Sequence, residues 1–390
     1  MTSARIFASG AIGFGGQPAI NDLLSAGYNT VIVWSVHVDC DGTLYLNDNK
    51  VVAGGTYCGA FPFNLPNRLA QLRRARIEVI FSVGAGGTSD FTNIGNLLNG
   101  QPASQGNPIY DNFKALKDAM KTADRGDIDA IDFDNEDNMT ADVMVNFGIT
   151  LANIGYANVT FCPFDYGDKD VWSDTMKGLV SAKGSAFVNA IHLQVYSGGR
   201  GNIDKVGKWK DVFTNAGGKA LMIPGLATNQ PKPGPWWYGK MGGSVLKKPN
   251  VAMFEGANWD NYLYTWNFST VEEALQGAQT AASFFFYCRG PLSLSWRSFQ
   301  RGDAVYFTGL PWWGPAFQCD GYYLGGPCTD VYNPNGVGAC PKDLRTQYAT
   351  WNKSFDGGFI WFYDSIVSCL QSGCCDPTGT ALAYRQAITG

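Results

Sequence analysis

Three carboxylates stand at alternate positions in the run DIDAIDFDNED, residues 127–137: Asp132, Asp134 and Glu136. The apolar residues between them favour a buried strand, and side chains on a strand point to opposite faces with period two, so the three acids should share one face. Burying like charges together costs several kcal/mol unless they are paired or protonated. We therefore expect at least one of the three to have a raised pKa and to share a proton with its neighbours, which suits a general acid.

Protonation of a glycosidic oxygen is one reaction that such an acid performs. Most glycosidases also need a second carboxylate, about 5 Å away for retention or about 6.5–9.5 Å away for inversion. Apart from Asp364, no other strand end in the sequence offers one. Alternating carboxylates could instead hold Mg²⁺ or Ca²⁺, and a glycan-binding protein without activity is a third reading. The two histidines, His37 and His192, have no evident nucleophile as partner.

The elements that would position these acids alternate along the chain. Short β-favouring runs, several of them apolar on both faces, are each followed by a segment with apolar residues at helical spacing. The expected strands are 5–14, 30–38, 77–87, 127–136, 157–164, 186–198, 219–227 and 357–364. This pattern predicts an α/β fold, a (β/α)8 TIM barrel, with a doubly wound sheet as the alternative. In a barrel the carboxyl ends of the strands carry the functional residues.

The alternation of strands and helices is interrupted between the seventh and eighth expected strands. Residues 1–390 are expected to form a single barrel domain, and residues 228–340 a large insertion packed on it, rich in Gly, Pro, Trp and Cys. Two tryptophan pairs in this insertion, at 236–237 and 312–313, suit stacking on sugar rings, although loop or core anchoring is equally compatible with them.

The composition argues against some classes of binding partner. The chain has a net charge of −4 and no basic stripe, so nucleic acid is not an expected partner. No apolar run is long enough to span a bilayer, which takes about 18 residues, and neither a cofactor nor a metal site is predicted. The ten cysteines suggest disulfides and an extracellular protein in its mature form, with Cys40–Cys58 and a cluster from Cys319 onward as guesses; a cytoplasmic protein is the alternative. The oligomeric state is left open.

The acidic run resembles a known family motif. Residues 129–136, DAIDFDNE, match the DxxDxDxE pattern of glycoside hydrolase family 18, the chitinases and endo-β-N-acetylglucosaminidases, where it lies on strand four of a (β/α)8 barrel. Three other runs resemble further elements of that family in the same order: SVGAGG at 82–87, QVY at 194–196 and GFIW at 358–361. The insertion matches no element of the family.

The resemblance implies a mechanism without a second carboxylate. In that family the carbonyl oxygen of the substrate's own 2-acetamido group attacks the anomeric carbon, giving an oxazolinium ion and retention. By this resemblance Glu136 would protonate the glycosidic oxygen and later activate water. Asp134 would bind the acetamido N–H and balance the developing charge, Asp132 would hold Asp134 through a shared proton, and Tyr196 would bind the acetamido oxygen.

The resemblance also implies which residues bind the substrate. Trp361 would stack beneath the sugar, and Gln194, Ser82 and Gly86 would line the site. The partner is then a glycan that contains N-acetylglucosamine, either chitin and its oligomers or an N-glycan core. Where many chitinases carry Asp or Asn after the tyrosine, this chain has Ser197, which leaves the choice of glycan open.

Overall fold

The computed structural model describes residues 2–228 apart from positions 11, 13–15, 48, 59–63, 122–127, 129 and 138–139. Beyond them it describes three short strands at 266–267, 294–295 and 304–307, followed by residues 341–372 and 379–390. The chain divides into two compact units. The first comprises Met1–Thr228, Val331–Asp364 and Thr380–Gly390, and the second comprises Asn229–Asp330 and Ser365–Gly379.

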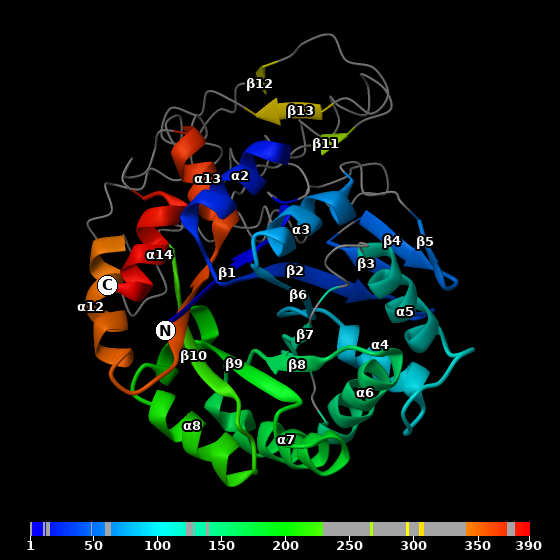
Figure 1. Cartoon of the computed structure of the whole chain (residues 1–390). Coiled ribbons are helices and arrows are strands. Elements are labelled where there is room, and N and C mark those ends of the chain that lie inside the picture. The colour runs from blue at the N-terminus through cyan, green and yellow to red at the C-terminus, as the bar shows by residue number, and fades with distance from the viewer. Residues whose placement is uncertain are drawn as a thin grey trace. The chain divides into compact units, whose positions relative to one another are not determined.

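Eight parallel strands close into a barrel in the first unit (Figure 1). In sheet order they are β1 (Ser3–Ala8), β14 (Gly357–Trp361), β10 (Leu221–Ala227), β9 (Val188–Gln194), β8 (Asn158–Phe161), β7 (Ala130–Phe133), β6 (Glu78–Val83) and β2 (Thr30–Val38). The pairing of β1 with both β14 and β2 closes the ring. The predicted (β/α)8 barrel is therefore confirmed, and the doubly wound sheet, which has open edges, is ruled out.

Helices surround the strands, as the ring of coiled ribbons in Figure 1 shows. They are α2 (Gly16–Ala26), α3 (Leu65–Arg74), α4 (Asp90–Leu98), α5 (Pro108–Met120), α6 (Ala141–Ile154), α7 (Lys169–Lys183), α8 (Val206–Asn215), α12 (Pro341–Trp351) and α14 (Ala381–Thr389). A further helix, α13 (Tyr363–Ser372), begins in this unit and continues into the second. Local sequence sets several of their ends. At α5 the Asn107 side chain accepts from the Ile109 N–H and Pro108 occupies the first turn, and α6 ends at Gly155 in the left-handed conformation.

A small antiparallel extension leaves the barrel beyond β2. It consists of β3 (Leu44–Leu46), β4 (Asn49–Ala53) and β5 (Thr56–Tyr57), paired in that order. The side chain of Asn112 on α5 holds it, accepting from the Gly55 N–H and donating to the Gly42 carbonyl, each at 2.6 Å. The sequence after residue 38 has no clear strand pattern and predicts a loop, which is wrong. The three strands are three, five and two residues long, too short to give a clear alternation.

The guessed Cys40–Cys58 disulfide is also wrong, since both thiols are free and exposed. Cys40 lies in the turn that joins β2 to β3, whereas Cys58 follows β5 at the other side of this extension. The cysteines from Cys319 onward lie outside the residues whose side chains are described, and the extracellular location stays a prediction.

The insertion between β10 and β14 is described only in part. Three short strands, β11 (Trp266–Asn267), β12 (Leu294–Ser295) and β13 (Ala304–Phe307), pair antiparallel with β13 in the middle. The two tryptophan pairs lie outside the described residues. The predicted packing of residues 228–340 on the barrel stays a prediction.

The barrel interior is filled by inward-facing side chains from almost every strand. One buried cluster contains Phe7, Ile32, Ile80, Ala130, Cys162, Ala190, Tyr196, Ile223, Ala227, Phe359 and Phe362. The cluster combines small side chains with large ones, which together fill the narrow barrel at close packing. Gly225 on β10 belongs to this arrangement, because a Cβ at that position would overlap the ring of Phe359.

Gly225→Ala is expected to lower the free energy of unfolding by about 1–3 kcal/mol, the usual effect of overpacking a core. Chemical denaturation of both proteins measures this difference. The matched control is Gly207→Ala on α8, where an added Cβ meets nothing within 4 Å and should stabilise the helix by up to about 1 kcal/mol. Equal stability of Gly225→Ala and wild type would contradict the packing described for the barrel interior.

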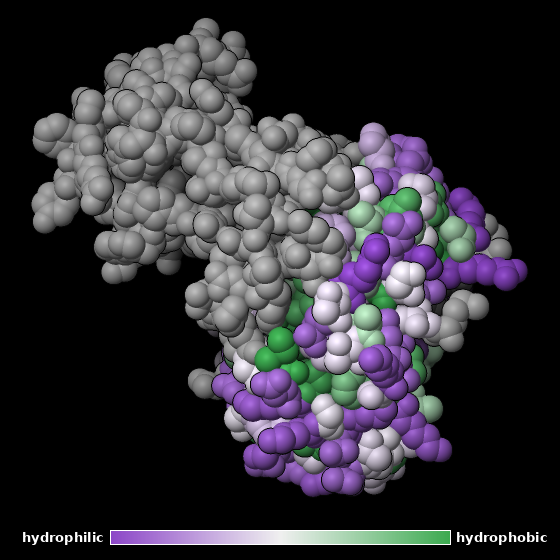
Figure 2. Space-filling view, turned by 90° about the vertical axis from the view of Figure 1, so that its left-hand side faces the viewer, coloured by the Kyte–Doolittle hydropathy of each residue, from purple (hydrophilic) through white to green (hydrophobic). Residues whose placement is uncertain are grey.

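The described surface is mostly hydrophilic, and hydrophobic side chains gather in places between the polar ones (Figure 2). Among the described residues, the exposed large hydrophobic side chains are Leu221 and Leu382. None of the helices in the described part of the chain has the length and apolar character that crossing a membrane requires.

Candidate active site

The acidic run begins on β7 and continues past its end. β7 ends at Phe133, so Asp132 lies on the strand whereas Asp134 and Glu136 follow it, and the predicted strand to residue 136 was too long. The Asp134 N–H still donates to the Val83 carbonyl at 2.9 Å, which extends the pairing with β6 by one residue. All three side chains nevertheless remain in one region. Asp132 and Asp134 are buried, and Glu136 is half-buried.

Asp132 forms the bottom of the site. Its carboxylate accepts from Ser82 Oγ at 2.9 Å and His192 Nδ1 at 2.7 Å, and also from the Thr160 hydroxyl. Arg5 Nη1 lies 3.0 Å from the other ring nitrogen of His192. An arginine can only donate, so His192 accepts there and is the neutral tautomer with its proton on Nδ1. Burial lowers the pKa of His192, which favours the same state.

Ser82 therefore occupies a place different from the predicted one. The sequence predicts that it lines the substrate site, yet its side chain is fully buried and donates to Asp132. Its function in this structure is to support the acidic run. His192, which sequence reasoning set aside, belongs to the same support. The signal that could have found it is its position on β9, two residues before Gln194 and so on the same face of the strand.

Asp134 is held by two donors from other strands. Trp34 Nε1 on β2 donates to Oδ2 at 2.9 Å, and Gln194 Nε2 on β9 donates to Oδ1 at 3.0 Å. Burial raises the pKa of Asp134 well above its usual value, and the nearby Glu136 and Asp132 raise it further. The predicted proton sharing between Asp132 and Asp134 stays a prediction, and the hydrogen bonds named above engage each carboxyl with its own donors.

Glu136 lies beside the same glutamine. Gln194 Nε2 donates to Glu136 Oε1 at 2.9 Å, so one amide nitrogen joins Asp134 and Glu136. Gly86 leaves room for this carboxyl, because a Cβ there would lie 2.7 Å from Glu136 Oε2. Burial raises the pKa of Glu136, partly offset by the hydrogen bond from Gln194 and reinforced by Asp137. A carboxyl of this kind keeps its proton to higher pH than an exposed one.

Two aromatic side chains border the acids. Tyr196, just past β9, and Trp361, at the end of β14, stack with centroids 5.6 Å apart and planes at 18°. Tyr196 is buried and Trp361 is half-buried. Burial raises the pKa of Tyr196 well above its usual value, so its hydroxyl stays protonated and can donate to a carbonyl oxygen. The structure thus brings the predicted residues Tyr196 and Trp361 to the same interior as the acids.

Asp364, the second carboxylate that the sequence offered, is bound elsewhere. It is buried and accepts a hydrogen bond from the Ser9 N–H at 2.7 Å, just after the end of β1. Asp129 lies outside the described residues. Within the described part of the chain, no group of three or more His, Cys, Asp or Glu side chains is arranged to hold a metal ion.

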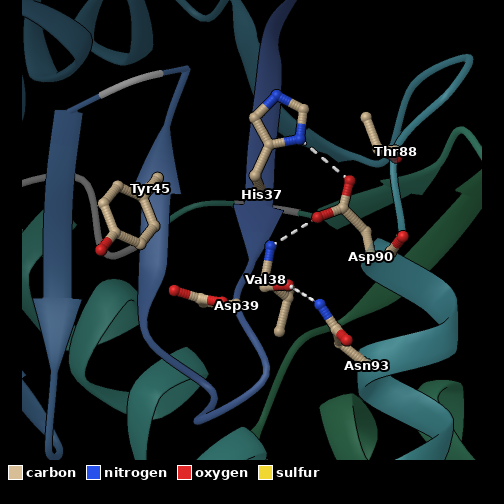
Figure 3. Close-up of a pocket in the computed structure, with 8 residues that line it drawn as sticks. His37, Val38, Asp39, Tyr45, Thr88, Asp90 and Asn93 are labelled. Atoms are coloured by element: carbon tan, nitrogen blue, oxygen red, sulfur yellow. Dashed lines mark hydrogen bonds and ion pairs between the residues drawn. The ribbon is translucent and has the colours of Figure 1, made fainter. Parts of the chain in front are cut away.

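A pocket of about 310 Å³ opens away from these acids, where β2, β3 and the segment before α4 meet (Figure 3). It is lined by His37, Val38, Asp39, Tyr45, Thr88, Ser89, Asp90 and Asn93. His37 Nδ1 lies 2.9 Å from Asp90 Oδ2, and its Nε2 lies 3.0 Å from Ser35 Oγ. Ser35, His37 and Asp90 are thus connected in the same order as the serine, histidine and aspartate of a catalytic triad. Ser35, however, is fully buried and cannot reach a substrate. The pocket was not foreseen from the sequence.

Comparisons with known proteins found similar proteins only among the solved structures. No protein-family model matches the chain, and no curated protein matches its sequence. A fungal endo-β-N-acetylglucosaminidase from glycosyl hydrolase family 18 is 14% identical over 58% of this chain and 78% of its own, with a TM-score of 0.44. A family GH18 chitinase from Cycas revoluta, in complex with allosamidin, is 10% identical over 99% of both chains, with a TM-score of 0.47.

A tamarind chitinase-like lectin is similar as well, at 9% identity over 58% of this chain and 81% of its own, with a TM-score of 0.33. The similar structures thus include both enzymes and a lectin. What the chain itself shows is a closed (β/α)8 barrel in which the acidic run follows β7, Gly86 lies beside Glu136, and Tyr196 stacks on Trp361. Of these features, the closed barrel is the one that the resemblance to glycoside hydrolase family 18 predicts.

Proposed function

We propose that this chain hydrolyses β-1,4 bonds of glycans that contain N-acetylglucosamine, with retention of configuration and with the substrate's own acetamido group as nucleophile. Glu136 protonates the glycosidic oxygen and then activates water. Asp134 binds the acetamido N–H and balances the charge of the oxazolinium ion, while Tyr196 donates to the acetamido oxygen. Trp361 supports the sugar ring.

The observation that carries the proposal is the shared donor between the two carboxyls. One amide nitrogen of Gln194 lies 3.0 Å from Asp134 Oδ1 and 2.9 Å from Glu136 Oε1. Both carboxyls also come from one segment, two residues apart just after β7, whereas the two-carboxylate mechanisms use a pair of acids that flanks the scissile bond. Asp364, the remaining candidate from the sequence, is engaged by the Ser9 N–H. An acetamido nucleophile accounts for the chemistry without a second carboxylate.

The raised pKa values support the same assignment. Burial favours the protonated form of both Asp134 and Glu136, so the pair retains a proton at a pH where exposed acids have lost theirs. The half-buried Glu136 is the member that an entering sugar can reach, and the deeper Asp134 is the member that can face the acetamido group. The general acid, Glu136, is thus the more exposed of the two carboxyls, and the charge-balancing group, Asp134, is the more buried.

A glycan panel assayed for cleavage and for binding tests this function. We expect cleavage of chitooligosaccharides, no cleavage of fully deacetylated glucosamine oligomers, and inhibition by thiazoline analogues of N-acetylglucosamine. Cleavage of an N-glycan core, with chitooligosaccharides left intact, would assign the chain to endo-β-N-acetylglucosaminidase action instead. Binding of N-acetylated glycans with no cleavage would show a lectin-like protein, and neither binding nor cleavage would refute the proposal.

A further inference from the structure

Trp34 contacts the candidate site although it lies outside every motif that the sequence offered. It is on β2, and its Nε1–H donates to Asp134 Oδ2 at 2.9 Å. The edge of its ring meets Trp361 at a centroid distance of 4.9 Å and an interplanar angle of 88°. The half-buried side chain packs against the barrel core, so its position is fixed by packing as well as by the hydrogen bond.

The surroundings of Asp134 make this donor important. Glu136 and Asp132 carry the nearby negative charges, and both come from the same run as Asp134. Buried Cys162, after β8, hydrogen-bonds Asp134, and burial keeps its thiol protonated by raising the thiol's pKa. The phenol of Tyr196 likewise stays neutral, since burial raises its pKa. No described cation is among the groups that act on Asp134, so the groups that favour its ionised form are neutral donors.

Two neutral donors bind different oxygens of the Asp134 carboxyl. Gln194 donates to Oδ1, and it also donates to Glu136, so it does not distinguish one acid from the other. Trp34 donates to Oδ2 of Asp134. An indole N–H can donate but cannot accept, so it favours the ionised form of the group it binds. The hydrogen bond from Trp34 lowers the pKa of Asp134 and opposes the effect of burial.

We propose that Trp34 is a positioning residue that favours the ionised form of Asp134 and thereby shifts the shared proton toward Glu136. The kinetic part of this inference rests on the proposed function. Two coupled acids that hold one proton have two arrangements, and only the arrangement with the proton on Glu136 can protonate a leaving group. The indole N–H favours that arrangement, and the fixed ring holds Asp134 in place beside the aromatic border of the site.

Trp34→Phe tests the inference, because it removes the N–H and keeps an aromatic ring against Trp361. A hydrogen bond to a charged group corresponds to about one to two pH units. We therefore expect the acidic limb of the kcat profile to move to higher pH by about one unit and kcat to fall about 10- to 100-fold. Replacing Trp34 with benzothienylalanine, which has sulfur in place of the N–H and the same shape, should give the same shift.

The matched control is Trp172→Phe on α7. Trp172 is fully buried, and its indole nitrogen has no hydrogen-bond partner among the described residues. This variant loses the same atoms from a packed interior, so it should lose stability but keep the wild-type pH profile. An equal shift of the profile in both variants would show that loosened packing, rather than the N–H, controls Asp134, and would overturn the inference.

A second readout does not depend on catalysis. In full-length protein with ¹³C-carboxyl-labelled aspartate, the Asp134 resonance is the one missing from Asp134→Asn, and its titration midpoint should be higher in Trp34→Phe than in wild type. If the midpoint moves but no glycan is cleaved, the inference holds and the proposed function fails. If glycans are cleaved and neither the midpoint nor the acidic limb moves in the two Trp34 variants, the proposed function holds and the inference fails.

Discussion

Glu136→Gln is expected to lower kcat by about 10²- to 10⁴-fold, the usual contribution of a general acid. The amide has nearly the shape of the carboxyl but has no proton to give to a leaving oxygen. Gln194, which donates to Glu136 Oε1 at 2.9 Å, can donate to the new amide oxygen in the same way. Substrate binding should change little, and initial rates on a chitooligosaccharide measure the loss.

The matched control for this loss is the neighbouring acid. Asp137→Asn removes a carboxylate one residue away, and Asp137 is held by the backbone N–H groups of Phe91 and Thr92 rather than by Gln194. We expect its activity to stay within a few-fold of wild type. Glu136→Gln with wild-type activity would exclude Glu136 as the acid, and an equally large loss in Asp137→Asn would assign the effect to local charge.

The pH dependence of the wild-type enzyme follows from the same residue. Because burial raises the pKa of Glu136, its acid form persists above the usual glutamic acid value of about 4.3. Activity should fall as pH rises through that raised value, since Glu136 then loses the proton it must donate. This alkaline limb is absent from the residual activity of Glu136→Gln, which has no carboxyl at this position.

Asp134→Asn is expected to lower kcat by about 10²- to 10³-fold, the usual loss when charge stabilisation is removed from a buried site. The asparagine oxygen can still accept from Trp34 or Gln194, but it carries no charge to balance the oxazolinium ion. Binding of a thiazoline analogue separates this role from that of Glu136. The analogue resembles the cyclic intermediate, so its affinity should fall in Asp134→Asn and remain in Glu136→Gln. Unchanged affinity in Asp134→Asn would remove Asp134 from the acetamido site.

The barrel could be predicted from the sequence because its strands have a strong local signal. β2, with the sequence TVIVWSVHV, and β9, with VNAIHLQ, are rich in β-branched or apolar residues and are buried on both faces. The weak elements were missed. α4, with the sequence DFTNIGNLL, is short and half polar, and β3 to β5 are two- to five-residue strands whose pairing depends on Asn112 far along the chain. The sequence of these short strands alone does not reveal that a residue as distant as Asn112 holds them.

The site was predictable where a motif marked it and not where the partners come from other strands. Asp134 and Glu136 were marked by their alternation in the sequence, and Tyr196 and Trp361 by the resemblance to motifs of a known family; their roles are proposals. Trp34 could not, because an aromatic residue in an apolar strand reads as core, and its hydrogen bond reaches Asp134, 100 positions away. The end of β7 at Phe133 was also invisible, since the alternation of acids continues beyond the strand.

The configuration of the first product tests the central claim most directly. ¹H NMR during the first minutes of chitooligosaccharide hydrolysis shows which anomer forms before mutarotation. A nucleophile supplied by the substrate predicts that the β-anomer appears first and that removal of the acetyl group from the reacting sugar abolishes cleavage. Initial formation of the α-anomer, or equal cleavage of the deacetylated oligomer, would contradict the account.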